Sequence, residues 1–178
     1  YPDIGCGLKR GFSFFHHKKG QSYSDQPARS QQLLVAASPR DELADTHWYR
    51  KDFDQHLISE AQSLGVEYFD QTELIDFHEN SEHVLLLGKR QSEIINFRVG
   101  FVVDASGPRG CLYRLLHLSE RKLPLMPMTS GLFAHFENVG SWKSEDGVPY
   151  PVEDAAVHHV FEGGWVWILK FNNGITSA

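Results

Sequence analysis

A single amphipathic helix is the feature that most constrains the fold of this 178-residue chain. It is predicted from Arg50 to Leu64, with apolar side chains at the spacing of one helical face: Phe53, Leu57, Ala61 and Leu64. Asp52 and Asp54 lie in its first turn, where acidic groups suit the helix dipole, and Gly65 is a typical C-terminal stop. We expect residues 66–69 to form a strand next, so that the helix leads into a sheet.

The middle of the chain alternates short apolar segments with polar turns. Three segments, 73–78, 82–88 and 94–98, have the spacing of a small antiparallel meander. The apolar run 99–103 then predicts a buried strand, which is followed by a turn containing glycine and by a helix over residues 112–118.

An aromatic segment near the start predicts a further strand over residues 11–17. In a strand, successive side chains point to opposite faces, so Phe12 and Phe14 share one face and Phe15 lies on the other. Residues 18–30 are polar and predict a loop.

The character of the chain changes after residue 122, where prolines interrupt it: Pro124, Pro127, Pro149 and Pro151. Strands are expected over residues 131–138, 157–161 and 165–171. We therefore expect a mixed α/β part over residues 1–122, which contains the meander, and a mostly antiparallel sheet over residues 123–178.

Charge and composition narrow the classes of protein. The net charge of -6 and the isoelectric point near 5.9 argue against a nucleic-acid partner, because phosphate binding needs a basic face. No apolar run reaches the length of a membrane-spanning helix, so no membrane partner is expected.

Residues 1–5 lack an initiator Met and the features of a signal peptide, and we expect an internal piece of a longer protein. Cys6 and Cys111 are interpreted as reduced thiols, which indicates a cytoplasmic protein.

Two segments offer groups that suit a phosphate-bearing ligand. Arg50 heads the predicted helix, and its fixed guanidinium suits phosphate or a developing negative charge. In the segment 102–109, Gly107 allows the backbone to approach a ligand closely, and the helix that follows has an N-terminus suited to phosphate. Each segment also has a plainer interpretation, namely a surface helix and a turn in which Asp104 or Ser106 caps a helix.

Two further segments suggest chemistry near a sheet. Lys9 lies shortly before Gly11 and the aromatic strand, and a lysine amine is a group that can take part in covalent catalysis. Trp165 and Trp167 alternate along a strand, so both rings lie on one sheet face. The plainer interpretations are a basic surface turn and two core tryptophans.

Taken together, in their order along the chain, the four segments resemble FAD-dependent oxidoreductases of the aromatic-hydroxylase and flavin-dependent (tryptophan) halogenase type. The helix is similar to the family's R-x-x-F-D-x-x-L helix, and Asp104 to Gly107 to its second cofactor motif. Lys9 is the candidate for the halogenase lysine, with Arg10 as the alternative at that position. The halogenases carry W-x-W-x-I-P, from which this chain departs at Leu169 and Lys170, so halogenation and hydroxylation both stay open.

The resemblance implies an α/β (α+β), FAD/NAD(P)-binding aromatic-hydroxylase-like fold, incomplete here, with an antiparallel sheet on the substrate side. It implies FAD as the cofactor, held by Arg50, Asp104 and Gly107. Lys9 would handle hypochlorous acid, and Trp165 and Trp167 would lie between flavin and substrate. The implied chemistry is that of a halogenase-like or monooxygenase-like enzyme, in which a flavin hydroperoxide acts on a halide or on an apolar or aromatic small molecule. A separate flavin reductase is a candidate partner.

A different class of function also stays open, a non-catalytic α+β binding or interaction domain that shares these short patterns. A metal site is not expected. The paired histidines at 16–17 and 158–159 are neighbours in predicted strands, so the two rings of each pair point to opposite faces. The G-x-G-x-x-G fingerprint of dinucleotide binding does not occur in the sequence.

Overall fold

The chain forms two compact units. The computed structural model describes residues 3–23, 30–35, 37–108, 110–119, 124–125, 127–142 and 148–178. The first unit contains residues 1–64 and 130–178, and the second contains residues 65–129. The division expected near residue 122 concerns the domains of a complete enzyme and stays a prediction.

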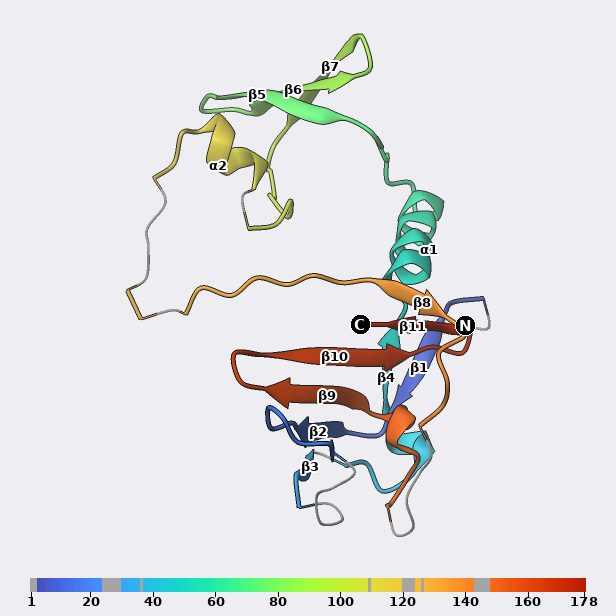
Figure 1. The fold of residues 1–178 in the computed structure, drawn as a ribbon. Coiled ribbons are helices and arrows are strands. Elements are labelled where there is room, and N and C mark those ends of the chain that lie inside the picture. Colours follow the sequence, from blue (N-terminus) through green and yellow to red (C-terminus); the bar gives the residue numbers. More distant parts are fainter. Residues whose placement is uncertain are drawn as a thin grey trace. The chain divides into compact units, whose positions relative to one another are not determined.

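A six-stranded sheet is the centre of the first unit, in the order β3-β2-β9-β10-β11-β8 (Figure 1). Its strands, in chain order, are β2 (Phe12–His16), β3 (Gln32–Val35), β8 (His135–Glu137), β9 (Ala156–Phe161), β10 (Gly164–Lys170) and β11 (Ile175–Ser177). Neighbouring strands are antiparallel except β2 and β9, which are parallel. The parallel pair joins the N-terminal and C-terminal stretches of the chain into one sheet.

The alternation predicted along β2 is confirmed. Phe14 stacks on His158, whereas Phe15 packs on His159 from the other side of β9. The strands expected over residues 157–161 and 165–171 are confirmed by β9 and β10.

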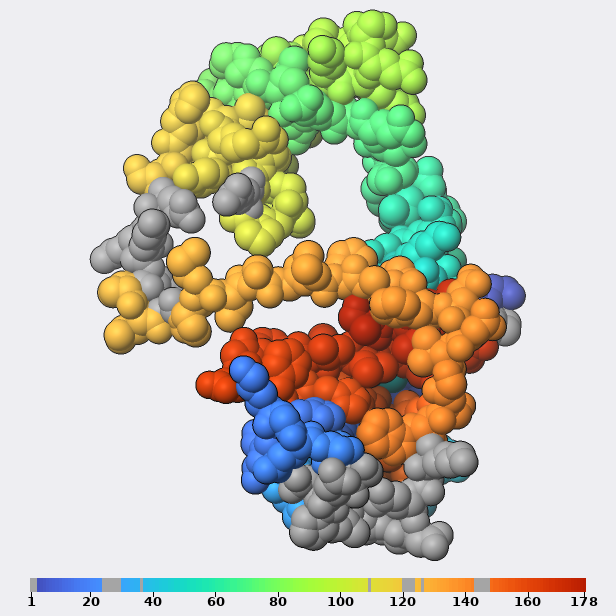
Figure 2. Space-filling model, in the orientation of Figure 1, coloured from blue at the N-terminus to red at the C-terminus, as the bar shows by residue number. Residues whose placement is uncertain are grey.

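The strand expected over residues 131–138 is shorter than predicted, because only His135–Glu137 pair with β11. Leu132 and Phe133 are almost fully exposed. Figure 2 shows this part of the chain, in orange, as a single extended thread. Apolar side chains alone do not make a strand, since the backbone also needs a neighbouring strand for its hydrogen bonds.

A two-stranded ribbon carries the helix of the first unit. β1 (Cys6–Lys9) pairs antiparallel with β4 (Asp45–Trp48), and a 3-10 turn, η2 (Asp41–Leu43), precedes β4. The predicted helix is confirmed as α1 (Arg50–Ser63), and Gly65 after it has a φ of 88°. Phe53 stacks on Trp48 with 5.0 Å between the ring centroids, but no residue of α1 is buried, so its apolar stripe stays largely open. No helix in the described part of the chain is long and apolar enough to cross a membrane.

Aromatic packing and a buried histidine hold the first unit together. Phe15 is buried with Val157 and with Val152 of a second 3-10 turn, η3 (Val152–Asp154). His47 in β4 is also buried, and its Nε2 lies 3.0 Å from the carbonyl oxygen of Lys170. This contact ties the ribbon to β10, and Gly7 opposite His47 leaves the room for it.

The second unit is built around the predicted meander, which is confirmed. Its strands are β5 (Glu73–Glu79), β6 (Val84–Arg90) and β7 (Glu93–Val99), paired antiparallel in that order, and a short helix follows, α2 (Cys111–Leu115). The helix expected over residues 112–118 is therefore present but shorter.

Two predicted strands of the second unit are wrong. Residues 66–69 are not in a strand, and of the run 99–103 only Val99 is, as the last residue of β7. Phe101 and Val103 are 82% and 78% exposed. Residues 66–69 and 101–103 form apolar runs, but within the described residues neither has a neighbouring strand to complete its hydrogen bonds.

We expect Gly7→Ala to destabilise the protein by about 1–3 kcal/mol, because overpacking has costs of this size. A Cβ at Gly7 would overlap the His47 ring and the carbonyl oxygen of Lys170. The measurement is the urea concentration at the midpoint of unfolding, provided that the dependence of the unfolding free energy on urea concentration stays the same. Gly131→Ala is the matched control, since nothing lies within 4 Å of a Cβ there. Equal midpoints for the two variants would contradict this account of the His47 contact.

Candidate active site

An aromatic face of the six-stranded sheet is the main candidate site. Phe14 stacks on His158 at 4.5 Å between ring centroids, and His158 stacks on Trp167 at 5.5 Å. The Phe12 ring lies 6.1 Å from His158. These rings cross β2, β9 and β10, which are neighbours in the sheet (Figure 1). Trp165 is two residues before Trp167 and therefore lies on the same face.

The two tryptophans are not core residues in this structure. Trp165 is 59% exposed and Trp167 is 48% exposed. The plainer interpretation of this pair as core tryptophans therefore does not hold. The aromatic face, made of Phe12, Phe14, His158, Trp165 and Trp167, is an open apolar surface with polarisable rings, suited to packing against a flat ligand.

Lys9 lies beside this face. It ends β1, and its Nζ is 4.6 Å from the centroid of the Phe12 ring. Its ammonium also pairs with Asp45 at 3.4 Å, and the Lys9 side chain is 23% exposed. Lys9 is far from Trp165 and Trp167 in the sequence. Its contact with Phe12 places it on the side of the sheet that carries both tryptophans. The catalytic role of Lys9 itself stays a prediction.

Arg10, the alternative to Lys9, is fixed by its surroundings. Its Nε and Nη2 donate to the carbonyl oxygen of Ser38 at 3.2 and 2.9 Å, and its Nη1 pairs with Asp41. The guanidinium also lies over the Tyr150 ring, 4.8 Å from its centroid, and Arg10 is buried. The Arg10 guanidinium is therefore engaged by Ser38, Asp41 and the Tyr150 ring within the first unit.

Arg50, the first predicted cofactor residue, is an exposed group of the first unit. Its Nε and Nη2 donate to the two carboxylate oxygens of Asp54 at 2.7 and 2.9 Å, and its side chain is 78% exposed. The hydrogen bond to Asp54 raises the pKa of Arg50. The guanidinium is therefore oriented by its own helix and accessible to a ligand.

Asp104 and Gly107, the other two predicted cofactor residues, shape one turn of the second unit. Oδ1 of Asp104 accepts from the amide and hydroxyl of Ser106 at 3.0 and 2.6 Å, and Oδ2 accepts from the amide of Leu112 at 2.9 Å. These bonds, led by that from the Ser106 hydroxyl, lower the pKa of Asp104 to about 2. Asp104 and Ser106 thus accept hydrogen bonds from amides at the start of α2, as the capping interpretation expects, although the N-cap position is Gly110 rather than either of them.

The backbone at Gly107 is the part of this turn that is open to a ligand. Gly107 has a φ of 96°, and nothing lies within 4 Å of a Cβ built there. Because both oxygens of Asp104 are used within the turn, contact with a cofactor would come through the backbone near Gly107. Arg50 and Asp104 belong to different units, so their binding of one nucleotide stays a prediction.

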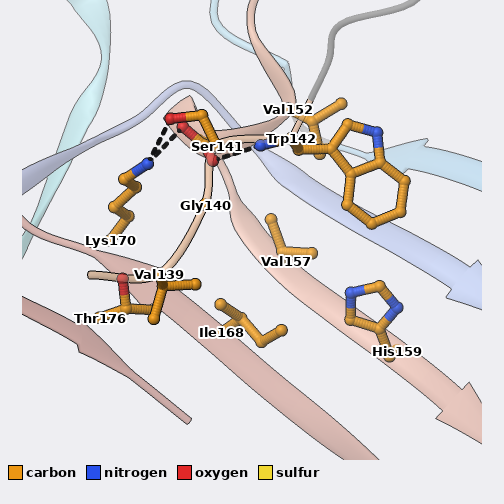
Figure 3. Close-up of a pocket in the computed structure, with 11 residues that line it drawn as sticks. Val139, Gly140, Ser141, Trp142, Val152, Val157, His159, Ile168, Lys170 and Thr176 are labelled. Carbon is orange, nitrogen blue, oxygen red and sulfur yellow. Dashed lines mark hydrogen bonds and ion pairs between the residues drawn. The ribbon is translucent and has the colours of Figure 1, made fainter. Parts of the chain in front are cut away.

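The opposite side of the six-stranded sheet contains a cavity of about 280 Å³, here called the rear pocket (Figure 3). Its apolar lining comes from the sheet residues Val157 and Ile168 and from Val139 and Trp142 of the segment that covers them. Lys170 closes one end together with two polar residues. The Lys170 ammonium donates to Ser141 Oγ at 2.8 Å and to Glu153 Oε2 at 2.9 Å.

Sequence reasoning missed the rear pocket. Lys170 was interpreted only as a departure from a motif. The available signal was the alternation along β10, because Ile168 and Lys170 must face away from Trp165 and Trp167.

A histidine pair lies near the rear pocket. Nε2 of His17 and Nδ1 of His159 share a hydrogen bond of 2.8 Å. Burial lowers the pKa of His159 from 6.5, and the charge of His17 lowers it further. His158 and His159 lie on opposite sides of β9, as predicted, with His158 on the aromatic face and His159 against Trp142.

Comparison with known proteins gives halogenase relatives, although no family model matches the chain. The chain is 28% identical over 176 residues to the monodechloroaminopyrrolnitrin halogenase PrnC of Pseudomonas fluorescens. It is 29% identical over 175 residues to the tetracycline 7-halogenase of Kitasatospora aureofaciens. These matches cover 97% and 94% of this chain but only 30% of each relative, so the chain spans about a third of their length.

Solved structures show the same fold. The halogenase PltM in complex with phloroglucinol and FAD superposes with a TM-score of 0.71 at 24% identity, over 97% of this chain and 35% of that chain. The flavin-dependent halogenase CmlS superposes with a TM-score of 0.56 at 21% identity, over 99% and 29%. The predicted resemblance to flavin-dependent halogenases and the predicted fold class are therefore confirmed.

We expect the free energy of unfolding to fall as the pH drops below about 6.5, in part because of His159. Its folded-state pKa lies below 6.5, so the unfolded chain binds more protons in that range and acid favours unfolding. Urea midpoints from pH 8 to pH 5 measure how the free energy of unfolding changes with pH. His159→Gln should make this pH dependence weaker. The control is His78→Gln, because His78 is an exposed histidine beside Asp76 in β5. An unchanged pH dependence in His159→Gln would show that this imidazole is not held neutral by its surroundings.

We expect the Asp104 turn to persist as long as its carboxylate is charged. The pKa is lowered from 3.8 to about 2, so the stabilisation is complete above pH 3.8 and is lost as the pH falls through 2. The Asp104→Ala variant should expose the amides of Ser106 and Leu112, and hydrogen exchange at these amides should become faster near neutral pH. Asp76→Ala, outside this turn, is the control. Unchanged exchange at Leu112 would disprove the capping role.

Proposed function

We propose that this chain forms the halogen-handling and substrate-facing part of an FAD-dependent halogenase, which acts on an apolar or aromatic small molecule by way of a flavin hydroperoxide. The observation that carries the proposal is the position of Lys9 beside the aromatic face, on the side of the sheet that presents Trp165 and Trp167. The halogenase relatives support it along nearly the whole chain.

FAD is the cofactor of this proposal, and its reduced form would activate oxygen, which is the oxidant. The chain offers groups that fit it. Gly107 has an open, left-handed backbone that suits close approach to a ligand. Arg50 presents an oriented and exposed guanidinium that suits phosphate or another anion.

Lys9 has the chemistry to hold a hypohalous acid. Its ammonium can donate a hydrogen bond to the acid's oxygen while Asp45 keeps the charge in place. The Phe12 ring lies against the ammonium, and Trp167 lies on the same side of the sheet, so an apolar substrate can pack beside Lys9. In this proposal Lys9 positions the halogen, and the aromatic face guides it toward an apolar substrate.

The departures from W-x-W-x-I-P weigh little against halogenation. Lys170 points to Ser141 and Glu153 in the rear pocket, away from the aromatic face (Figure 3). Leu169 shares the side of Trp167 by alternation, and leucine is close to isoleucine in volume.

The remaining alternatives have less support. The relatives are enzymes, which favours catalysis over a non-catalytic binding domain, and their names favour halogenation over hydroxylation. A separate flavin reductase and a cytoplasmic location stay predictions.

The test is Lys9→Ala in the full-length protein, supplied with reduced FAD, oxygen and bromide or chloride. We expect halogenated product to fall about 100-fold or more, as for other positioned catalytic groups, while the rate of flavin oxidation is unchanged. Product is measured by mass spectrometry and flavin oxidation by absorbance. Lys19→Ala, an exposed lysine of the loop after β2, is the control. Unchanged halide-dependent product in Lys9→Ala would sink this role.

A further inference from the structure

We propose that the rear pocket is a second small-molecule site, which binds a neutral aromatic molecule of up to two fused rings with one hydroxyl or carbonyl oxygen. The pocket lies on the side of the sheet opposite to the aromatic face, and the proposal does not depend on the proposed function.

The size and lining of the rear pocket set the apolar part of the ligand. Its volume is about 280 Å³, roughly twice that of an apolar cavity of about 150 Å³ that holds benzene. Val157 and Ile168 form the sheet side, and Trp142 lies over them. The Trp142 and His159 rings are 5.7 Å apart and tilted by 32°, so they offer a flat ligand an aromatic wall.

The polar end of the pocket sets the charge of the ligand. Lys170 and Glu153 pair at 2.9 Å with side chains only 32% and 26% exposed, so their charges cancel and an ionic ligand has no unpaired partner. An ammonium has three donors, and within the part of the chain that the structure describes Ser141 and Glu153 accept from two of them. The third donor can reach an oxygen of a bound molecule.

Glu153 also ties the covering segment to this end. Its Oε1 accepts from the amide of Trp142 at 2.7 Å, while its Oε2 holds Lys170. One carboxylate therefore positions both the aromatic wall and the polar end. A site in which the wall and the donor share one anchor is pre-organised for a ligand that has both a ring and an oxygen.

The test uses 2-naphthol as the probe and the full-length protein labelled with 5-fluorotryptophan. The fluorine signal of each tryptophan is assigned by its loss in a single Trp→Phe variant. We expect the Trp142 signal to shift saturably, with a Kd of about 0.1–1 mM, as for a ligand of this size. The signals of Trp165 and Trp167 report separately on the aromatic face.

Two variants on one strand locate the binding. Ile168→Phe fills the pocket and should abolish the shift of Trp142. Val166→Phe is the matched control, because Val166 lies on the same side of β10, is 39% exposed and is outside the pocket lining. If Trp142 does not respond to the probe, or if the two variants behave alike, the proposal is overturned. The first outcome includes the case in which another part of the full-length protein fills the pocket.

A comparison of two probes tests the third N–H of the Lys170 ammonium. Lys170→Met should weaken 2-naphthol binding about tenfold, the loss of one hydrogen bond to a charged donor, and leave naphthalene binding unchanged. Lys170→Arg keeps a cation and should restore most of the affinity for 2-naphthol. Equal losses for both probes in Lys170→Met would assign the residue a purely structural role and overturn the predicted oxygen in the ligand.

Discussion

The parallel pairing of β2 with β9 is the constraint on which the rest of the first unit depends. It places Phe14 opposite His158, and the antiparallel pairing of β9 with β10 places Trp167 opposite the same residue. Side chains alternate along a strand, so a slip of one residue would exchange the two faces of β2. Phe15 would then enter the aromatic face, and the core around Val157 would lose its buried aromatic ring.

Local alternation could be predicted from the sequence, whereas the pairing of distant strands could not. The period of two placed Trp165 with Trp167 and separated Phe14 from Phe15 before any partner strand was known. Nothing local to β2 specifies β9 as its neighbour, because the hydrogen bonds of a ladder are made by the backbone and are the same for every residue type. The approach of Lys9 to Phe12 depends on such pairings and was therefore found only in the structure.

The failed predictions share one physical cause. An apolar run shows that a segment would gain from burial, but it does not supply the neighbour that buries it. Residues 101–103 illustrate this, since Phe101 is exposed within a chain that spans about a third of its relatives. The turn after them was predicted with two roles, to cap the helix and to bind the cofactor, and the second role stays a prediction. Asp104 is used for capping, which leaves the backbone at Gly107 as the accessible part.

β10 shows how one short pattern can serve two environments. Residues 165, 167 and 169 lie on the aromatic face, whereas residues 166, 168 and 170 lie on the other side of the sheet. A change at one position of such a pattern bears only on the environment that its side chain enters. Lys170 enters the rear pocket, where it forms an ion pair with Glu153 that a proline could not make. The departure that looked like evidence against one activity is thus a polar feature of a separate cavity, and the two tryptophans keep their common face.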